Sequence, residues 1–321
     1  MHRDALEFTA AGARPTPLFP PVIVNRSGRH AGSRLRVVLL NAAGGRRFRE
    51  ILACLQRKPL AGADVILLCE VNAGLRRRAV GRDVAEELGA ALGMSCAYVR
   101  EFALRLTGSE IETYMGNAIL SSAPFEDVAA IAMYNPRPPR VLPRRDRGVT
   151  RVGGPTGLIT RVKFGAAEIS IGVAHLHSRC TPAARARQMA DYLESFPTAG
   201  RMIFGGDLNT TTTELSDRAS MMTTVWQMIT NPQRFRAPQA YEPLFDHLRE
   251  HGLELDGVNV ANRPTFTFSG LIPRSMRPKL DWLAVRDLRP IAGTASVLTP
   301  RSPILKRRVS DHDFVTVDLE L

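Results

Sequence analysis

Carboxylate, amide and imidazole side chains directly follow several short apolar runs in this sequence. Asn41, Glu70 and His175 each come after such a run, and a further run leads into Asp207 and Asn209. Runs of this length are typical of buried strands, and the loops at the carboxyl ends of strands are where ligand-binding residues gather. We therefore expect these side chains to converge on one site.

The last part of the chain adds further candidates. Asp281 opens an apolar run, and Asp311 and His312 precede the final run. A hard divalent cation such as Mg²⁺ binds carboxylate and amide oxygens and retains several waters, and Mn²⁺ accepts the same ligand types. The sequence predicts Glu70, with Asn41 and Asp311, as the ligands of such a cation.

The remaining candidates suit proton transfer and phosphate binding. An acid beside a histidine fixes its tautomer and supports it as a base, so Asp281 and His312 are predicted to pair. Asp207 would orient the attacking water. Asn209 and His175, as hydrogen-bond donors, would hold the non-bridging phosphate oxygens. The chemistry predicted for this set is metal-dependent hydrolysis of a phosphate ester.

The elements that must position these residues can be read from hydrophobic periodicity. β-Branched and aliphatic runs predict strands over 35–40, 65–69, 97–102, 111–120, 128–133, 158–164, 169–174, 201–204, 280–285 and 314–321. Apolar residues three or four positions apart predict helices over 48–56, 84–92, 183–196 and 243–251. The fold class predicted is α+β.

The domain organisation follows from where this pattern begins. Residues 1–34 mix Pro, Gly and Arg without periodicity, so we expect a poorly ordered basic leader with no secretory signal. No break in composition divides 35–321, which we expect to form one catalytic domain.

The composition of the chain limits the classes of protein to which it can belong. The chain has 321 residues, of which 44% are hydrophobic, which is an ordinary globular composition. No run approaches the roughly 20 apolar residues that cross a bilayer. The four cysteines lack metal-ligand spacing and form no disulfide framework. We expect a cytoplasmic protein, and the oligomeric state is left open.

The net charge of +12 favours a polyanionic partner. All of the 43 basic residues are arginines except for the four lysines, Lys58, Lys163, Lys279 and Lys306. Such a skew can also arise from codon bias, so charge alone leaves nucleic acid as one substrate class among several.

The order of the polar motifs resembles that of the endonuclease/exonuclease/phosphatase superfamily, which includes deoxyribonucleases, apurinic endonucleases, neutral sphingomyelinases and inositol polyphosphate phosphatases. The resemblance covers 35–321 and rests on these blocks in family order: Asn41, Glu70, Gly-Asn-Ala-Ile-Leu-Ser at 116–121, His-Leu at 175–176, Arg-x-x-Gln at 185–188, Gly-Asp-x-Asn at 206–209, Thr-Phe at 265–266, Leu-Asp-Trp at 280–282 and Ser-Asp-His at 310–312. Each block is weak alone, and the ordered set is specific.

The resemblance implies a four-layer α/β/β/α sandwich of two packed mixed sheets flanked by helices. It assigns the same roles as the residue types do: Glu70 as the main metal ligand, Asp207 and Asn209 as the water-orienting and phosphate-holding pair, and Asp281 with His312 as the acid and histidine dyad. Asn117, within the 116–121 block, is expected to contact the substrate.

Two departures from the motifs of apurinic endonucleases narrow the choice of branch within the superfamily. Apurinic endonucleases resemble Asn-x-Asp at the first motif, whereas Ala42 and Ala43 follow Asn41 here. They also lack the histidine found at His175. The chain therefore leans towards the deoxyribonuclease and sphingomyelinase side.

Two further segments lie outside this set of blocks. The arginine-rich stretch 137–151 is either a solvated loop or a clamp for a phosphate backbone that includes Arg144 and Arg145. The stretch 221–236 carries Trp226 and Met228, and we expect its apolar residues to pack in the core.

The sequence thus predicts a Mg²⁺-dependent phosphodiesterase, with a nuclease as the leading interpretation. A sphingomyelinase-like phospholipid phosphodiesterase, a small-molecule phosphatase and a catalytically idle phosphate-binding protein remain as alternatives.

Overall fold

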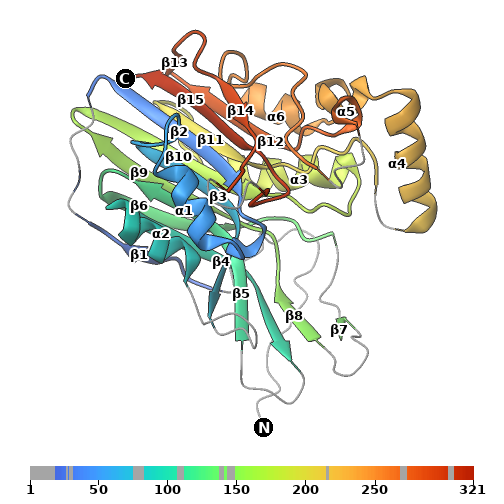
Figure 1. Cartoon of the computed structure of the whole chain (residues 1–321), viewed down its shortest axis with the longest axis horizontal. Helices are drawn as coiled ribbons and strands as arrows, with labels where there is room; N and C mark the ends of the chain where they lie inside the picture. Colours follow the sequence, from blue (N-terminus) through green and yellow to red (C-terminus); the bar gives the residue numbers. More distant parts are fainter. Residues whose placement is uncertain are drawn as a thin grey trace.

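Two β-sheets form the centre of the computed structural model (Figure 1), which describes residues 19–26, 28, 32–74, 83–106, 112–136, 141–142, 149–214, 217–267, 273–302 and 307–321. The larger sheet has ten strands and follows the order β13-β15-β2-β3-β5-β4-β8-β7, with β1 paired to β4 and β14 paired to β15. Its strands are β1 (Val22–Val24), β2 (Arg34–Asn41), β3 (Val65–Gly74), β4 (Ser95–Leu106), β5 (Glu112–Ser121), β7 (Val141–Leu142), β8 (Val149–Gly153), β13 (Arg289–Pro290), β14 (Ser296–Leu298) and β15 (Phe314–Glu320).

The smaller sheet has five strands in the order β12-β11-β10-β9-β6. They are β6 (Phe125–Ala132), β9 (Thr156–Phe164), β10 (Ala167–His175), β11 (Met202–Asp207) and β12 (Asp281–Arg286). In each sheet one central pair is parallel, β2 with β3 and β10 with β11. Parallel neighbours bring the carboxyl ends of their strands to the same edge. Asn41, His175 and Asp207 end β2, β10 and β11, whereas β3 continues beyond Glu70.

Side-chain alternation along the strands builds the layers. In β2, Leu35, Val37 and Leu39 belong to the core between the two sheets, whereas Val38 and Leu40 face the opposite way, into a second core. A strand buried on both faces must be apolar at every position, which explains the continuous apolar runs of the sequence.

Helices cover the outer face of each sheet. On the large sheet lie α1 (Phe48–Leu55) and α2 (Val84–Leu92), and on the small sheet lie α3 (Pro182–Leu193) and α6 (Leu244–Glu250). The four-layer α/β/β/α sandwich is therefore confirmed, as are the predicted strands and these helices. The other helices are α4 (Arg218–Thr230), α5 (Gln233–Arg236) and the short 3₁₀ turns η1 (Ala43–Gly45), η2 (Pro238–Ala240) and η3 (Arg274–Met276).

Part of the predicted leader is a strand. Val22–Val24 pairs with β4, and the side chain of Asn25 exchanges hydrogen bonds with the backbone of Phe125. The short apolar stretch 22–24 gains its partner only from tertiary structure, so its own sequence pattern is too short to indicate it. Among the helices of the described residues, none combines the length and apolar character needed to span a membrane.

Candidate functional site

The register of the small sheet places three polar residues side by side. His175 at the end of β10 pairs with Asp207 at the end of β11, and Asp207 pairs with Asp281 at the start of β12. Gly206 permits this close packing, because a Cβ atom there would lie 1.8 Å from the backbone oxygen of Ala174. The glycine of Gly-Asp-x-Asn therefore serves strand packing, and the Asp that follows is held in the row.

The large sheet contributes Asn41 and Glu70 from its parallel pair. Asn41 lies opposite Cys69 in the register, and β3 bulges between Leu68 and Val71, with Glu70 in the left-handed region at a φ of 50°. One amide N–H of Asn41 donates to Glu70 Oε1 at 3.2 Å and the other to Asp207 Oδ2 at 2.9 Å. Asn41 thus links the carboxylates of the two sheets.

Asn41 is oriented differently from a metal ligand. Its amide oxygen accepts a hydrogen bond from the backbone N–H of Ala43 at 3.0 Å, so the amide nitrogen faces the carboxylates. Rotation of the amide would be needed to turn the oxygen towards a cation. In the arrangement observed, Asn41 positions Glu70 and Asp207.

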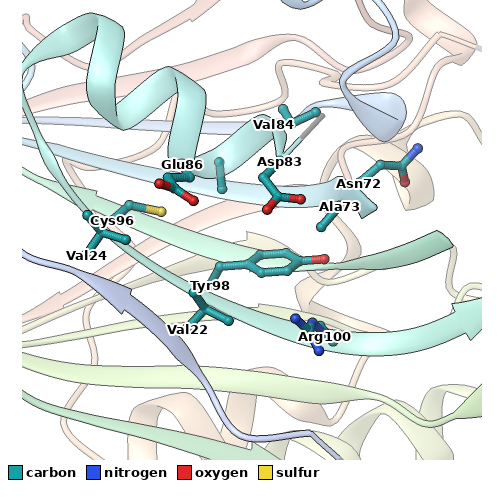
Figure 2. A pocket seen from close by; sticks show the side chains of 11 residues that line it. Val22, Val24, Asn72, Ala73, Asp83, Val84, Glu86, Cys96, Tyr98 and Arg100 are labelled. Atoms are coloured by element: carbon teal, nitrogen blue, oxygen red, sulfur yellow. The ribbon is translucent and has the colours of Figure 1, made fainter. Parts of the chain in front are cut away.

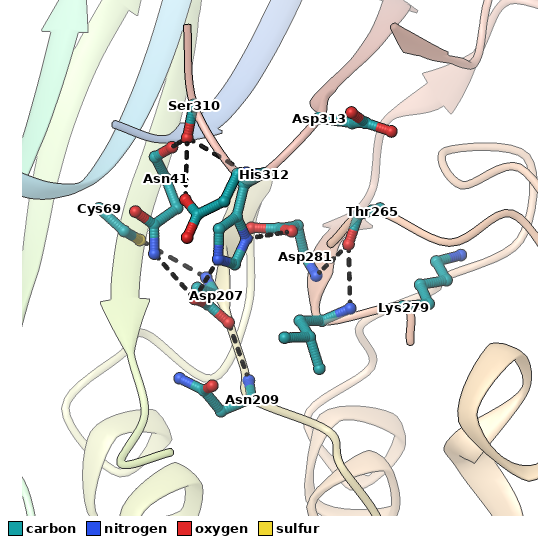
Figure 3. A network of polar contacts seen from close by, with 12 residues as sticks. Asn41, Cys69, Asp207, Asn209, Thr265, Lys279, Asp281, Ser310, His312 and Asp313 are labelled. Carbon is teal, nitrogen blue, oxygen red and sulfur yellow. Dashed lines mark hydrogen bonds and ion pairs between the residues drawn. The ribbon is translucent and has the colours of Figure 1, made fainter. Parts of the chain in front are cut away.

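His312 pairs with Asp281, as the sequence predicts. The distance from Nδ1 of His312 to Oδ2 of Asp281 is 2.8 Å, and both side chains are buried (Figure 3). The hydroxyl of Thr265 accepts the backbone N–H of Asp281, and the hydroxyl of Ser310 accepts that of His312. The Thr-Phe and Ser-Asp-His blocks therefore hold the two partners in place.

The carboxylates around His312 favour its charged form. Burial lowers the pKa of His312, but the negative charges of Asp281 and Asp207 outweigh it and raise this pKa to about 10. The pKa of Asp207 is raised to about 6, because burial outweighs the opposing effect of the two histidines and the Asn41 hydrogen bond. Nε2 of His312 lies 3.6 Å from Oδ2 of Asp207. At neutral pH these pKa values leave His312 protonated and Asp207 mostly ionised, so the two side chains form an ion pair beside Asp281.

The segment after β11 carries Asn209. Its φ is 49°, its backbone N–H donates to Oδ1 of Asp207, and its side-chain amide donates to the carbonyl of Leu176 at 2.7 Å. Asn209 is buried, at 5% exposure.

Glu101 belongs to the site and was not identified from the sequence. It is buried in β4, and its Oε2 lies 3.5 Å from Nδ1 of His175. Burial lowers the pKa of His175, and the hydrogen bond and charge of Glu101 raise it more strongly, to about 9. The signal available was a single acid inside the predicted strand 97–102, a position that is costly for an unpaired charge.

The described residues form two groups whose ligand atoms lie within 4.8 Å of one another. One contains Glu70, His175 and Asp207, and the other contains Asp207, Asp281 and His312. Oε1 of Glu70 is 3.8 Å from Nε2 of His175, and Glu70 is the most accessible carboxylate of the two groups. This oxygen-rich set fits a hard divalent cation, with Glu70 at the open side.

Two predicted residues of the described part of the chain, Asp311 and Asn117, belong to neither group, although the charge of Asp311 contributes to raising the pKa of His312. Asp311 is exposed and belongs to neither group, and its carboxylate accepts a hydrogen bond from Ser310 at 3.4 Å. Asn117 is fully buried, and its amide donates to the carbonyl of Thr156. The backbone N–H of Thr156 in turn donates to Glu101, so Asn117 is linked to the site through Thr156. Arg144 and Arg145 lie outside the described residues.

A shallow pocket elsewhere does not compete with this site. It lies between β1, β4 and α2, where Val22, Tyr98 and Asp83 line it (Figure 2). None of the clustered acids and histidines contributes to its lining. We therefore place the functional site at the strand ends.

Comparisons with known proteins agree with this fold. The sequence model of the "Endonuclease/Exonuclease/phosphatase family" matches residues 38–312. A similar solved structure is an endonuclease/exonuclease/phosphatase from Beutenbergia cavernae, with a TM-score of 0.59 at 17% identity, covering 90% of this chain and 72% of that chain. Humanized D. rerio TDP2 has a TM-score of 0.52 at 14% identity over 90% of this chain and 100% of that chain.

The catalytic domain of human Nocturnin is also similar in fold. Its TM-score is 0.53 at 15% identity, and the match covers 95% of this chain and 98% of that chain. No curated protein matches the sequence. At such identities the solved structures support the fold, and the family model supports the family.

Proposed function

The chain belongs to the endonuclease/exonuclease/phosphatase family, and from this premise we propose that it is a Mg²⁺-dependent phosphodiesterase. Members of the family are typically phosphoric ester hydrolases that depend on a divalent metal. The observation that carries the proposal is the row of His175, Asp207 and Asp281 across three strands, with His312 in contact with Asp281.

The proposed roles follow from the positions of the side chains. Glu70 is the accessible carboxylate and would hold the cation, with Asp207 beside it, after rotation of the Asn41 amide. Asp311 remains a further proposed ligand, since its exposed carboxylate lies close enough to His312 to contribute to the raised pKa of that histidine. When bound, the cation would polarise the phosphate and offset part of the carboxylate charge. Mn²⁺ would serve in the same position.

The chain itself supplies proton transfer and phosphate binding. Asp207 orients the attacking water, and His312, fixed by Asp281, exchanges a proton at Nε2, the ring nitrogen that faces Asp207. His175, kept cationic by Glu101, and the amide of Asn209 hold the non-bridging phosphate oxygens as negative charge builds up.

Nucleic acid is the substrate class that we propose first, because a net charge of +12 raises the local concentration of polyanions. Arg144 and Arg145 would then grip the phosphate backbone. A phospholipid phosphodiester is the second candidate, and a specific observation favours it: α4 exposes five large apolar side chains.

The test is a substrate panel with Mg²⁺ or Mn²⁺ that comprises plasmid DNA, RNA, sphingomyelin and a chromogenic phosphodiester. Hydrolysis of at least one substrate should stop in excess chelator and return when metal is restored. Glu70→Ala should abolish hydrolysis, whereas Glu168→Ala, an exposed acid of β10, should not. Circular dichroism and thermal unfolding verify that both variants fold. Full activity in chelator, or in Glu70→Ala, would overturn the proposal.

A further inference from the structure

One face of α4 is apolar and exposed to solvent. Five side chains on it are between 51% and 71% exposed, namely those of Met221, Met222, Val225, Trp226 and Ile229. The sequence predicts that these residues pack in the core, and the structure shows that this prediction is wrong for all five. They make up most of the large hydrophobic residues that are exposed in the described part of the chain.

The spacing of these residues defines a continuous ridge, which we call the α4 ridge. At 3.6 residues per turn, positions 221, 222, 225, 226 and 229 fall within an arc of about 140°. The adjoining face holds Thr224 and Met228, which are buried against the protein. The helix therefore uses one face for its own packing and leaves a second apolar face without a partner among the described residues.

The α4 ridge is held firmly in relation to the catalytic segment. Asp217 and Ser220 form a reciprocal capping box at the start of the helix. The hydroxyl of Thr224 lies 2.7 Å from that of Thr213, which follows Asn209 by four residues. Because the helix is capped and anchored, the exposed face is a feature of the folded protein and does not result from fraying.

The surroundings of the ridge are basic and aromatic. The sequence contains no Asp or Glu between Arg218 and Tyr241. The guanidinium of Arg234 in α5 lies 4.4 Å from the ring centre of Tyr241, which is 42% exposed, and η3, with Arg274, packs against α5. Burial lowers the pKa of Arg274 most, and the charges of Arg263, Arg277 and Arg308 lower it further, whereas Asp313, 3.9 Å away, raises it. The segment that directly follows α4 thus carries Arg234 and Arg236 and no acid as far as Tyr241.

We propose that the α4 ridge docks on an anionic phospholipid membrane, with the arginines of α5 and η3 against the lipid headgroups. Apolar residues that include Trp, flanked by basic residues and a Tyr, are the composition that binds at a membrane interface. This inference concerns binding and goes beyond the proposed function, since it requires no hydrolysis.

Two other occupants fit less well. The five side chains expose on the order of 500 Å² together, whereas a stable protein interface buries roughly 800 Å² on each partner. A second copy of the chain would therefore need further contacts. Nucleic acid binds through cationic and hydrogen-bonding groups, and the exposed Met, Val and Ile side chains of the ridge supply none.

Tryptophan fluorescence provides a direct test. The chain has two tryptophans, Trp226 at 66% exposure on the ridge and Trp282 at 1% in the core. Only Trp226 can change its environment on docking. The Glu70→Ala protein in chelator is mixed with vesicles of phosphatidylcholine that contain phosphatidylserine, or with vesicles of phosphatidylcholine alone. We expect a blue shift and co-flotation with the anionic vesicles, both weakened by high salt.

Substitutions on the α4 ridge distinguish vesicle binding through the ridge from nonspecific adsorption to lipid. Val225→Gln combined with Ile229→Gln retains the Trp226 reporter and should lower vesicle partitioning by more than about tenfold. Ile23→Gln is the matched control, because Ile23 is 46% exposed on β1, far from α4 (Figure 1), and it should bind as the parent protein does.

Three results would overturn the proposal: no shift with anionic vesicles, equal binding of the double variant, or a Trp226 shift that depends on protein concentration or on duplex DNA without lipid. A shift that depends on protein concentration would identify a second copy of the chain as the occupant, and a shift that depends on duplex DNA would identify nucleic acid. Since the assay measures binding in chelator, its outcome is independent of whether the protein hydrolyses phosphodiesters.

Discussion

His312 is fixed from two sides, since Asp281 binds its Nδ1 and Phe266 packs against its ring with centres 4.7 Å apart. We predict that His312→Ala reduces the chemical step by roughly 10²- to 10⁴-fold, and that Asp281→Asn reduces it less, because the imidazole remains but its orientation is weakened. Single-turnover kinetics measure the step. His247→Ala, on the surface of α6, is the control. If His312→Ala kept near-normal turnover, the proton-transfer role would have to be assigned to His175 instead.

Lys279, just before Asp281, is buried with its Nζ 3.9 Å from the ring centre of Trp282. Burial lowers its pKa to about 7, whereas a lysine in the unfolded chain titrates near 10.4. Between these values the unfolded chain binds a proton that the folded chain does not, so stability rises with pH. We predict that the free energy of unfolding of the wild type rises relative to that of Lys279→Met by at most about 1.4 kcal/mol per pH unit in this window. Urea denaturation across the pH range measures it, and parallel curves would contradict it.

The site residues differ in how far their positions follow from the sequence. Glu70, Asp207 and His175 could be placed together because each directly follows an apolar run, although β3 continues past Glu70 to Gly74 through the bulge. Glu101 could not, because its side chain reaches His175 from inside a strand of the other sheet, and that contact depends on how the two sheets stack. The roles of all these residues stay predictions.

At the scale of elements, the segment that carries Asn209 is held by a fully buried ion pair. Arg185 of α3 contacts Glu242 through two hydrogen bonds, at 3.0 and 2.5 Å, and Glu242 also accepts the backbone N–H of Thr212. Arg185 of the Arg-x-x-Gln block thus holds the segment after β11, whereas Gln188 binds the backbone of His177 and Tyr134.

Breaking this pair should be costly. We predict that Arg185→Met lowers the free energy of unfolding by about 3–5 kcal/mol, because the Glu242 carboxylate is left buried and unpaired. Adding Glu242→Met should recover part of the loss, since no charge then remains. Arg249→Met, which breaks the exposed pair with Asp246, should cost less than about 1 kcal/mol. Chemical denaturation gives all the values, and equal losses in the single and double variants would contradict the argument.

Helix α4 shows why periodicity alone misassigns burial. The stretch 221–236 is apolar enough to suggest core, yet the two apolar faces of the helix look alike in sequence. Only the position of the helix relative to the sheets decides which face is covered, and that follows from the hydrogen bond between Thr224 and Thr213 and from the packing of Met228. The strands were easier to predict because both of their faces are buried.

For the whole molecule, the sandwich could be predicted because the order of strands and polar blocks is distributed along the entire chain, whereas the pairing of β1 required the folded sheet. The charge of +12 is also a property of the whole chain. It predicts electrostatic attraction to polyanions without identifying which one binds.

Salt dependence tests the contribution of the arginine-rich stretch. If Arg140, Arg144, Arg145 and Arg147 contact a DNA backbone, the logarithm of the binding constant should fall with the logarithm of salt concentration with a slope of about −0.9 per phosphate. Replacing the four with Ser should flatten the slope and leave turnover of a small chromogenic phosphodiester unchanged. An unaltered slope would mean that the stretch is a solvated loop.

The left-handed backbone at Glu70 lowers the stability of the fold at a residue that the proposed hydrolysis requires. Its φ of 50° at the β3 bulge costs a side-chain-bearing residue roughly 1 kcal/mol, and its carboxylate adds negative charge beside Asp207. Glycine adopts this conformation freely, so Glu70→Gly should melt no lower than the wild type in calorimetry while losing hydrolysis. A laboratory selection for heat resistance alone would therefore tend to discard this residue, and only a simultaneous demand for turnover would retain it.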